Sequence, residues 1–133
     1  MFDALYSIFN QGYVQLKPSK VCDGVGVFAL RKIPKFTVLF LDVEPDTDLL
    51  TWESLEQADE KVVRYLKSIC NTSKDGIYLS RTINSINVSY YINHSEQPNT
   101  VHNISTDTFV TIKTIEPGEE LLCKYAPEDI DWM

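Results

Sequence analysis

The sequence lacks any arrangement of cysteines typical of a metal site or a disulfide framework. Its three cysteines, Cys22, Cys70 and Cys123, are odd in number and far apart, and no two of them form a Cys-x-x-Cys pair. Zinc sites and disulfide-rich secreted domains both depend on closely patterned cysteines. We therefore predict a protein of a reducing compartment with no bound metal.

The chain also lacks a long hydrophobic run and a basic leader. No apolar stretch approaches the length needed to span a bilayer, and residues 1–6 contain none of the basic residues that begin a secretory signal. These absences predict a soluble intracellular protein, in the cytoplasm or nucleus, that does not bind membranes.

An excess of basic charge is missing as well. The chain has 12 Lys and Arg against 19 Asp and Glu, for a net charge of -7. This balance argues against direct nucleic-acid binding, which relies on Lys and Arg to neutralise phosphates. It favours a basic partner such as a Lys-rich tail, although acidity that only keeps the protein soluble is an open alternative.

What is present is a series of short segments with the composition of strands, interrupted by one long helical segment. With 133 residues, the chain is predicted to form a single domain over residues 1–133, of α+β class and mainly β. The helical spacing of apolar residues predicts helices at Met1–Tyr13 and Leu49–Cys70, the latter as one or two helices capped by Ser54 or Asp59. Asn71–Gly76 is predicted to be a loop. The predicted strands are Tyr13–Leu16, the end of Asp23–Ala29, Phe36–Val43, Ile77–Leu79, Val88–Ile92, Thr100–Ile104, Phe109–Ile112 and Leu121–Tyr125.

Asn93-His94-Ser95 directly follows the apolar segment Val88–Ile92, and a Pro98-Asn99 turn comes next. Amide and imidazole groups that end a core strand are well placed to hold a polar ligand. A strand that runs into an Asx-rich turn is the alternative interpretation.

Two further motifs flank this centre. Gly24 and Gly26 would let the backbone approach a ligand closely, although Gly-x-Gly is also common in hairpin turns. A dinucleotide fingerprint is excluded because Ala29 stands where its third glycine belongs and Pro34 interrupts any following helix. Near the C-terminus, the predicted type II turn Glu116–Glu119 leads into a strand that ends at Tyr125, which taken alone could be a buried structural tyrosine.

In this order, the three motifs resemble those of the SET domain, a fold of protein-lysine methyltransferases. Asp23–Ala29 is similar to the family's Gly-x-Gly motif, Asn87–Asn99 to its Asn-His-Ser motif, and Ile115–Tyr125 to its closing Gly-Glu-Glu-Leu and tyrosine motif. The resemblance covers residues 13–125. It implies a β-clip-like assembly of small sheets with a C-terminal pseudoknot, a helical insertion at about 49–70 and a tail at 126–133.

The resemblance also implies an activity, the transfer of methyl from S-adenosylmethionine to a lysine of a protein such as a histone of chromatin, with S-adenosylhomocysteine as the product. Tyr125 would then be the catalytic residue. The other implied site residues are Gly24, Val25, Gly26, Asn93 and His94 for the cofactor, and Tyr91 and Cys123 for the substrate channel.

The sequence departs from the family pattern at several positions. Glu96 stands where many members have a zinc-binding Cys, and no Cys follows Tyr125, so no zinc is expected. Cys123 replaces a Phe or Tyr that limits the number of methyl groups, which implies room for di- or trimethylation. The family's usual residues are also replaced at Ser85, Ile86 and Tyr90.

These departures leave two alternatives open. The chain could be a catalytically weak or inactive SET-like module that binds a peptide or partner protein, or an unrelated small β domain whose motifs are turns. Aromatic residues near the N-terminus also suggest a homodimer; they are Phe2, Tyr6 and Phe9.

Overall fold

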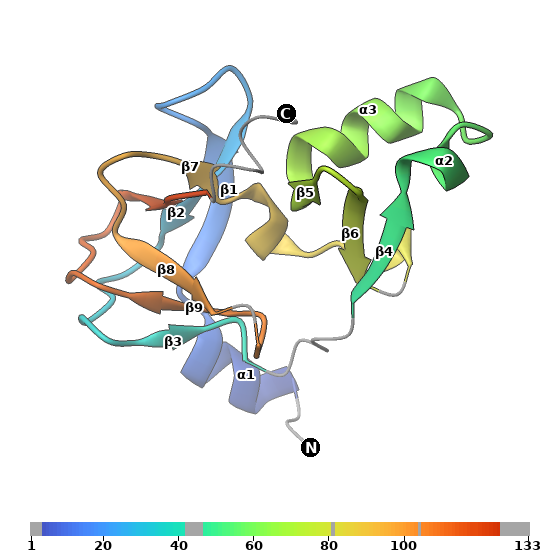
Figure 1. Cartoon of the computed structure of the whole chain (residues 1–133). Helices are drawn as coiled ribbons and strands as arrows, with labels where there is room; N and C mark the ends of the chain where they lie inside the picture. The colour runs from blue at the N-terminus through green and yellow to red at the C-terminus, as the bar shows by residue number, and fades with distance from the viewer. Residues whose placement is uncertain (1–3, 42–46, 81, 104, 126–133) are drawn as a thin grey trace. The chain divides into compact units, whose positions relative to one another are not determined.

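The computed structural model describes residues 4–41, 47–80, 82–103 and 105–125. The chain forms two compact units: unit 1 comprises Met1–Val43 and Tyr91–Lys124, and unit 2 comprises Glu44–Tyr90 and Tyr125–Met133. Short strands supply most of the regular structure, which confirms the mainly β fold (Figure 1). The single domain over residues 1–133 stays a prediction.

Unit 1 begins with helix α1 (Ala4–Gln11) and contains two sheets. In the first, β2 is antiparallel to both β1 and β10, whereas β7 runs parallel to β10. In the second, β3, β9 and β8 lie side by side (Figure 1). The strand orders are β1 (Val14–Pro18), β2 (Val25–Ala29), β10 (Glu120–Cys123), β7 (Asn93–His94) for the first and β3 (Val38–Leu39), β9 (Thr108–Thr111), β8 (Thr100–Asn103) for the second.

The core of unit 1 lies around β2 and β10. Val27 and Leu121, which face each other across these strands, are fully buried. Ile33 and Ile115 are also fully buried and form an isolated bridge in which each N–H donates to the other's carbonyl at 2.8 Å. Burying side chains of this kind stabilises a fold by about 1.5–3 kcal/mol each. The two motif-bearing strands thus lie in the buried core of the unit.

Unit 2 packs two helices on a three-stranded sheet of order β4, β6, β5. On α3, the apolar positions Val63, Leu66 and Ile69 recur at helical spacing and belong, with the capping Cys70, to one hydrophobic cluster with Ile77 and Leu79 of the sheet. Asp59 caps α3 by accepting a hydrogen bond from Lys61 N–H at 2.8 Å, as one of the predicted caps required. The elements are β4 (Thr47–Thr51), α2 (Trp52–Leu55), α3 (Glu60–Ile69), β5 (Thr72–Ser73), β6 (Gly76–Ser80) and the 3₁₀ turns η1 (Ile83–Ser85) and η2 (Val88–Tyr91), of which the last residue, Tyr91, belongs to unit 1.

The prediction of a strand at Val88–Ile92 was wrong, because residues 88–91 form η2. Asn87 Oδ1 accepts hydrogen bonds from Ser89 N–H at 2.9 Å and from Ser89 Oγ at 2.6 Å, and Tyr90 N–H donates to Asn87 O. Such local side-chain bonds compete with strand pairing. The strand comes later, at Asn93–His94.

Three other local predictions need correction. Residues 49–51 of the predicted helical segment belong to strand β4, and Thr51 rather than Ser54 caps α2. The predicted loop Asn71–Gly76 contains β5. The predicted strand Phe36–Val43 shrinks to Val38–Leu39, because Phe36 and Phe40 take left-handed φ values of 67° and 65°, while its last two positions lie outside the described residues.

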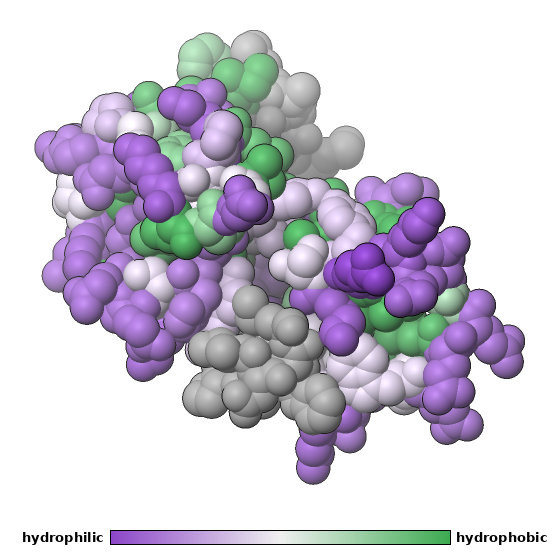
Figure 2. Space-filling view, turned by 90° about the horizontal axis from the view of Figure 1, so that it is seen from above, coloured by the Kyte–Doolittle hydropathy of each residue, from purple (hydrophilic) through white to green (hydrophobic). Residues whose placement is uncertain are grey.

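Much of the surface seen in Figure 2 is hydrophilic, with smaller hydrophobic areas between. On α1, Ile8 and Phe9 are 64% and 70% exposed. The helix predicted at Met1–Tyr13 is confirmed over residues 4–11. The homodimer stays a prediction. Phe2 lies outside the described residues. None of the described helices combines the length and apolarity needed to cross a membrane.

Candidate functional site

Asn93 joins two of the motifs in unit 1. Its Nδ2 lies 3.0 Å from Val25 O, in the Gly-x-Gly segment, where it donates a hydrogen bond. The same nitrogen lies within donating distance of Glu120 Oε2 at 3.1 Å and Ser19 Oγ at 3.2 Å. The structure therefore brings the Asn-His-Ser and Gly-x-Gly segments into direct contact, although about 70 residues of the printed sequence separate them.

Glu120 lies at the centre of this cluster and is only 7% exposed. Its Oε1 accepts a hydrogen bond from Lys20 N–H at 2.9 Å, and its Oε2 accepts one from Ser19 Oγ at 2.8 Å in addition to that of Asn93. None of the ion pairs between described residues includes Glu120. A buried carboxylate is costly unless hydrogen bonds replace its hydration, and here both oxygens are supplied with donors.

The two glycines differ in what surrounds them. A side chain on Gly26 would collide with the Glu120 carboxylate and come within 3.3 Å of Asn93 Nδ2. A Cβ on Gly24 would meet only Cys22 Sγ, at 3.8 Å. A side chain at position 26 would thus force the Glu120 carboxylate to move, whereas the backbone at Gly24 is open.

His94 lies on β7, at an edge of the first sheet, opposite Cys123 in the parallel register with β10. Its Nε2 is 3.2 Å from Glu96 Oε1, and Glu96 Oε2 is 3.2 Å from Lys124 Nζ. The hydrogen bond and charge of Lys124, followed by the hydrogen bond of His94, lower the pKa of Glu96. Glu96 and Lys124 are mostly exposed, so this ion pair is screened by solvent.

The remaining predicted site residues lie on both units. Cys123 is buried at the end of β10, and Tyr91 is half-buried at the end of η2; both belong to unit 1. Tyr125, which follows β10 by two residues, is half-buried and belongs to unit 2. The roles of these three side chains stay predictions.

Ser19 and Glu120 also belong to the cluster around Asn93, although neither was predicted from the sequence. Ser19 lies in a polar connection that showed no distinctive pattern. Glu120 offered one signal, because it is a charged residue that directly precedes the apolar Leu121-Leu122-Cys123 run and shares its strand. A charge inside a buried strand calls for partners.

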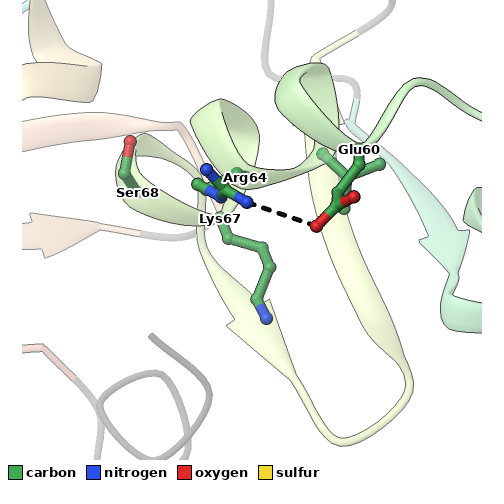
Figure 3. A pocket seen from close by; sticks show the side chains of 5 residues that line it. Glu60, Arg64, Lys67 and Ser68 are labelled. Carbon is green, nitrogen blue, oxygen red and sulfur yellow. Dashed lines mark hydrogen bonds and ion pairs between the residues drawn. The ribbon is translucent and has the colours of Figure 1, made fainter.

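A hollow of about 380 Å³ on unit 2 has a different character (Figure 3). All of its lining residues belong to α3, and the dashed ion pair in it joins Arg64 and Glu60 side chains that are 75% and 87% exposed. It is thus the exposed flank of a helix. In the part of the chain that the structure describes, no three His, Cys, Asp or Glu side chains gather as a metal-binding group.

The sequence matches one known protein family. A family model for the SET domain matches residues 24–126. The chain belongs to the SET domain family. The match includes all three motifs and supports the resemblance drawn from them. A search of curated proteins found no significant match.

Solved structures share the SET fold of this chain. A Plasmodium falciparum protein named as a candidate histone methyltransferase aligns with a TM-score of 0.53 and 21% identity, over 86% of this chain and 94% of its own. A humanized mutant of the Chaetomium thermophilum Polycomb Repressive Complex 2, bound to an inhibitor, aligns with a TM-score of 0.56 and 23% identity over 86% of this chain. The Chaetomium thermophilum complex in an autoinhibited conformation, bound to S-adenosylmethionine, aligns with a TM-score of 0.57 and 24% identity over 87% of this chain. In both of the latter, the match spans 15% of the larger chain.

Proposed function

We propose that this SET domain transfers a methyl group from S-adenosylmethionine to the side-chain amine of a lysine in a protein substrate. The hydrogen bond from Asn93 Nδ2 to Val25 O carries the proposal, because it joins the two segments that the family resemblance assigns to the cofactor. A similar structure that is bound to S-adenosylmethionine supports the same cofactor.

The residues present fit the amino-acid end of this cofactor. The Asn93 contacts described above use its amide nitrogen, and its Oδ1 makes no hydrogen bond with the residues that the structure describes. An amide oxygen is a suitable acceptor for an α-ammonium group. The open space beside Gly24 leaves the backbone of that segment accessible to a ligand.

When bound, S-adenosylmethionine supplies a methyl group activated by a sulfonium and leaves as S-adenosylhomocysteine. Asn93, the His94 backbone and the backbone of Gly24–Gly26 would hold it. Free lysine has a pKa of about 10.4, so its amine must lose a proton to solvent before its lone pair can attack. A channel that includes Tyr91 and Cys123 would disfavour the ammonium form, and the Tyr125 hydroxyl would orient the amine.

We propose that the C-terminal segment threads beneath a loop as a pseudoknot, as the family resemblance implies. One observation supports this threading: β10 pairs with both β2 and β7, and in the pairing with β7 Leu122 lies opposite Asn93.

The substrate class follows from charge. A net charge of -7 favours a basic segment, such as a histone tail or a Lys-rich part of another intracellular protein. Cys123 in place of a larger aromatic residue favours di- or trimethylation. We propose no zinc and no direct contact with nucleic acid or membrane.

The test is calorimetric titration of S-adenosylmethionine into the wild-type protein and into Tyr125→Phe, followed by a methyl-transfer assay of both on mixed histones and on a protein lysate. We expect both proteins to bind the cofactor and only the wild type to transfer methyl at a measurable rate. Failure of the wild type to bind would overturn the proposal.

A second candidate function is a SET module that binds a peptide or partner protein with little or no catalysis. The observation in its favour is that Ile86 and Tyr90, two positions that depart from the family pattern, pack against the apolar core of unit 2. Cofactor binding by the wild type without transfer to any protein in either mixture would favour this candidate.

A further inference from the structure

All three motifs meet at one carboxylate. Glu120 belongs to the Gly-Glu-Glu-Leu motif at the start of β10, contacts Asn93 of the Asn-His-Ser motif, and lies against Gly26 of the Gly-x-Gly motif. Through Lys20 N–H and Ser19 Oγ it also holds the connection that leads to Gly24. Ser19 N–H in turn donates to Gly24 O at 2.8 Å. The Glu120 side chain therefore ties Ser19 and Lys20 to β10, in addition to the backbone pairing of β2 with β1 and β10.

Both terminal atoms of the side chain at position 120 must be hydrogen-bond acceptors. Oε1 faces a backbone N–H, which can only donate, and Oε2 faces the Asn93 amide nitrogen, which can also only donate. A glutamine at position 120 would have the same shape but would present its own NH₂ to one of these donors. An ionised carboxylate satisfies both, and the resulting charge-assisted bonds are stronger than neutral ones.

Asn93 gains its orientation from the same contact. With its nitrogen drawn toward Glu120 Oε2 and Val25 O, the amide is fixed in the orientation that directs Oδ1 away from them. Loss of the carboxylate would leave Val25 O as the main acceptor that sets this preference, and it would free Ser19 Oγ and Lys20 N–H from β10 at the same time. Preorganisation of this kind raises affinity because the ligand does not have to order the site.

We infer that Glu120 is a positioning residue, which holds residues 19–26 and the Asn93 amide in the arrangement that binds the amino-acid end of the cofactor. This inference rests on the proposed function for the identity of the ligand. Glu120 itself would touch neither the cofactor nor the substrate, and it would act through Asn93 and the backbone of the Gly-x-Gly segment.

The experiment compares Glu120→Gln with Glu119→Gln, which removes the same charge one residue earlier from an exposed side chain whose Oε1 accepts from Glu116 N–H. We expect Glu120→Gln to raise the Kd and KM for S-adenosylmethionine about tenfold or more, with the KM for the protein substrate and kcat at saturating cofactor within about twofold of wild type. Glu119→Gln should match the wild type in all four values.

A spectroscopic measurement reads the positioning directly. In the wild type, the Lys20 amide proton is bonded to a carboxylate, and its NMR resonance should lie downfield; in Glu120→Gln it should move upfield, while Glu119→Gln leaves it in place. If Glu120→Gln does not fold, Ser19→Ala removes one donor to the carboxylate with little change in volume, and should raise the cofactor Kd by a smaller factor.

The outcomes separate the two proposals. An unchanged cofactor Kd in Glu120→Gln, beside normal binding by the wild type, would overturn the role of Glu120 and leave the proposed function intact. A wild-type protein that does not bind S-adenosylmethionine would overturn the proposed function and the cofactor role of Glu120 with it. A Lys20 resonance that is the same in the wild type and Glu120→Gln would contradict the positioning itself.

Discussion

Asn99 is hydrogen-bonded to Leu122 through both its side chain and its backbone. Asn99 Oδ1 accepts from Leu122 N–H at 2.8 Å, and Asn99 N–H donates to Leu122 O at 3.1 Å. Its Nδ2 also donates to Glu120 O at 2.9 Å. One asparagine thus takes the place of a neighbouring strand along β10, the strand that carries Glu120 and leads toward Tyr125.

Replacement of Asn99 by alanine should therefore lower stability. Asn99→Ala leaves Leu122 N–H and Glu120 O without their partners, which costs about 1–3 kcal/mol for each group that stays buried. Urea unfolding should show this loss, whereas Asn103→Ala, at an exposed asparagine whose bonds stay within its own hairpin, should cost less. Equal losses in the two variants would contradict the bracing role of Asn99.

The two glycines of the Gly-x-Gly segment should respond differently to alanine. Gly26→Ala places a methyl group against the Glu120 carboxylate, so we expect a loss of about 1–3 kcal/mol in stability together with weaker cofactor binding. Gly24→Ala meets only Cys22 Sγ at 3.8 Å and should change stability by less than about 1 kcal/mol. Thermal unfolding of the pair, each with its own cofactor titration, checks this order; a reversed order would refute it.

Elements whose structure is decided by local chemistry could be predicted from the sequence. The turn at Glu116–Glu119 was predicted as type II from its Pro-Gly pair, and the structure has Gly118 at a φ of 85° with Glu119 N–H donating to Glu116 O at 3.1 Å. The hairpin of β8 and β9 and the Asp59 cap were predicted on similar grounds. In each case the residues that determine the structure are neighbours in the sequence.

Short apolar segments could not be predicted in the same way, because their composition is compatible with both a strand and a turn. Val88–Ile92 has the composition of a strand, but Asn87 caps it as a 3₁₀ turn. Phe36 and Phe40 are good strand residues that nevertheless take left-handed φ values. Between Phe36 and Phe40, Val38 and Leu39 form β3 and pair with β9. Tertiary contacts thus override the strand propensity of the two phenylalanines.

The candidate site shows the same limit. Motif order indicated Asn93 and the Gly-x-Gly segment, but the contact between them depends on β7, β10 and β2 lying in one sheet. Glu120 was missed because its partners, Ser19 and Lys20, are about 100 residues away in the sequence. No local pattern reveals a carboxylate whose donors come from such a distance.

The ion pair of Glu96 should make a small pH-dependent contribution to stability. Because Lys124 and His94 lower its folded-state pKa below 4.5, the contribution is present above the unfolded pKa and is lost as the pH falls through the folded value. Glu96→Gln should be slightly less stable than wild type at pH 7, and the difference should vanish in acid and shrink in high salt. Glu116→Gln, at another exposed glutamate, serves as the control. A gap that persists below the folded pKa would contradict this account.

The size of the residue at position 123 should determine the methylation product. If Cys123 lines the lysine channel, the wild type should proceed beyond monomethyl-lysine, and Cys123→Phe should stop earlier because its ring would fill that space. Since Cys123 is buried, the variant's folding must be verified by circular dichroism. Mass spectrometry of a time course is the measurement, and a wild type that stops at monomethyl product would refute the prediction.

Cys22 and Cys70 should differ in reactivity toward alkylating reagents, because burial disfavours the reactive thiolate form of a cysteine. Burial raises the pKa of Cys70 to about 12, whereas Cys22 is exposed. Iodoacetamide at pH 8 should therefore modify Cys22 quickly and Cys70 only after unfolding, with Cys22→Ser as the control.

The raised pKa of Cys70 also affects the stability of the protein. In the unfolded chain the Cys70 thiol has a pKa near 9.0 and loses its proton first, so the free energy of unfolding is highest below pH 9.0 and declines as the pH rises toward 12. Cys70→Val lacks this thiol and should lose less stability between pH 8 and pH 11 than the wild type. Equal alkylation rates for Cys22 and Cys70 in the folded protein would show that the thiol of Cys70 is not protected.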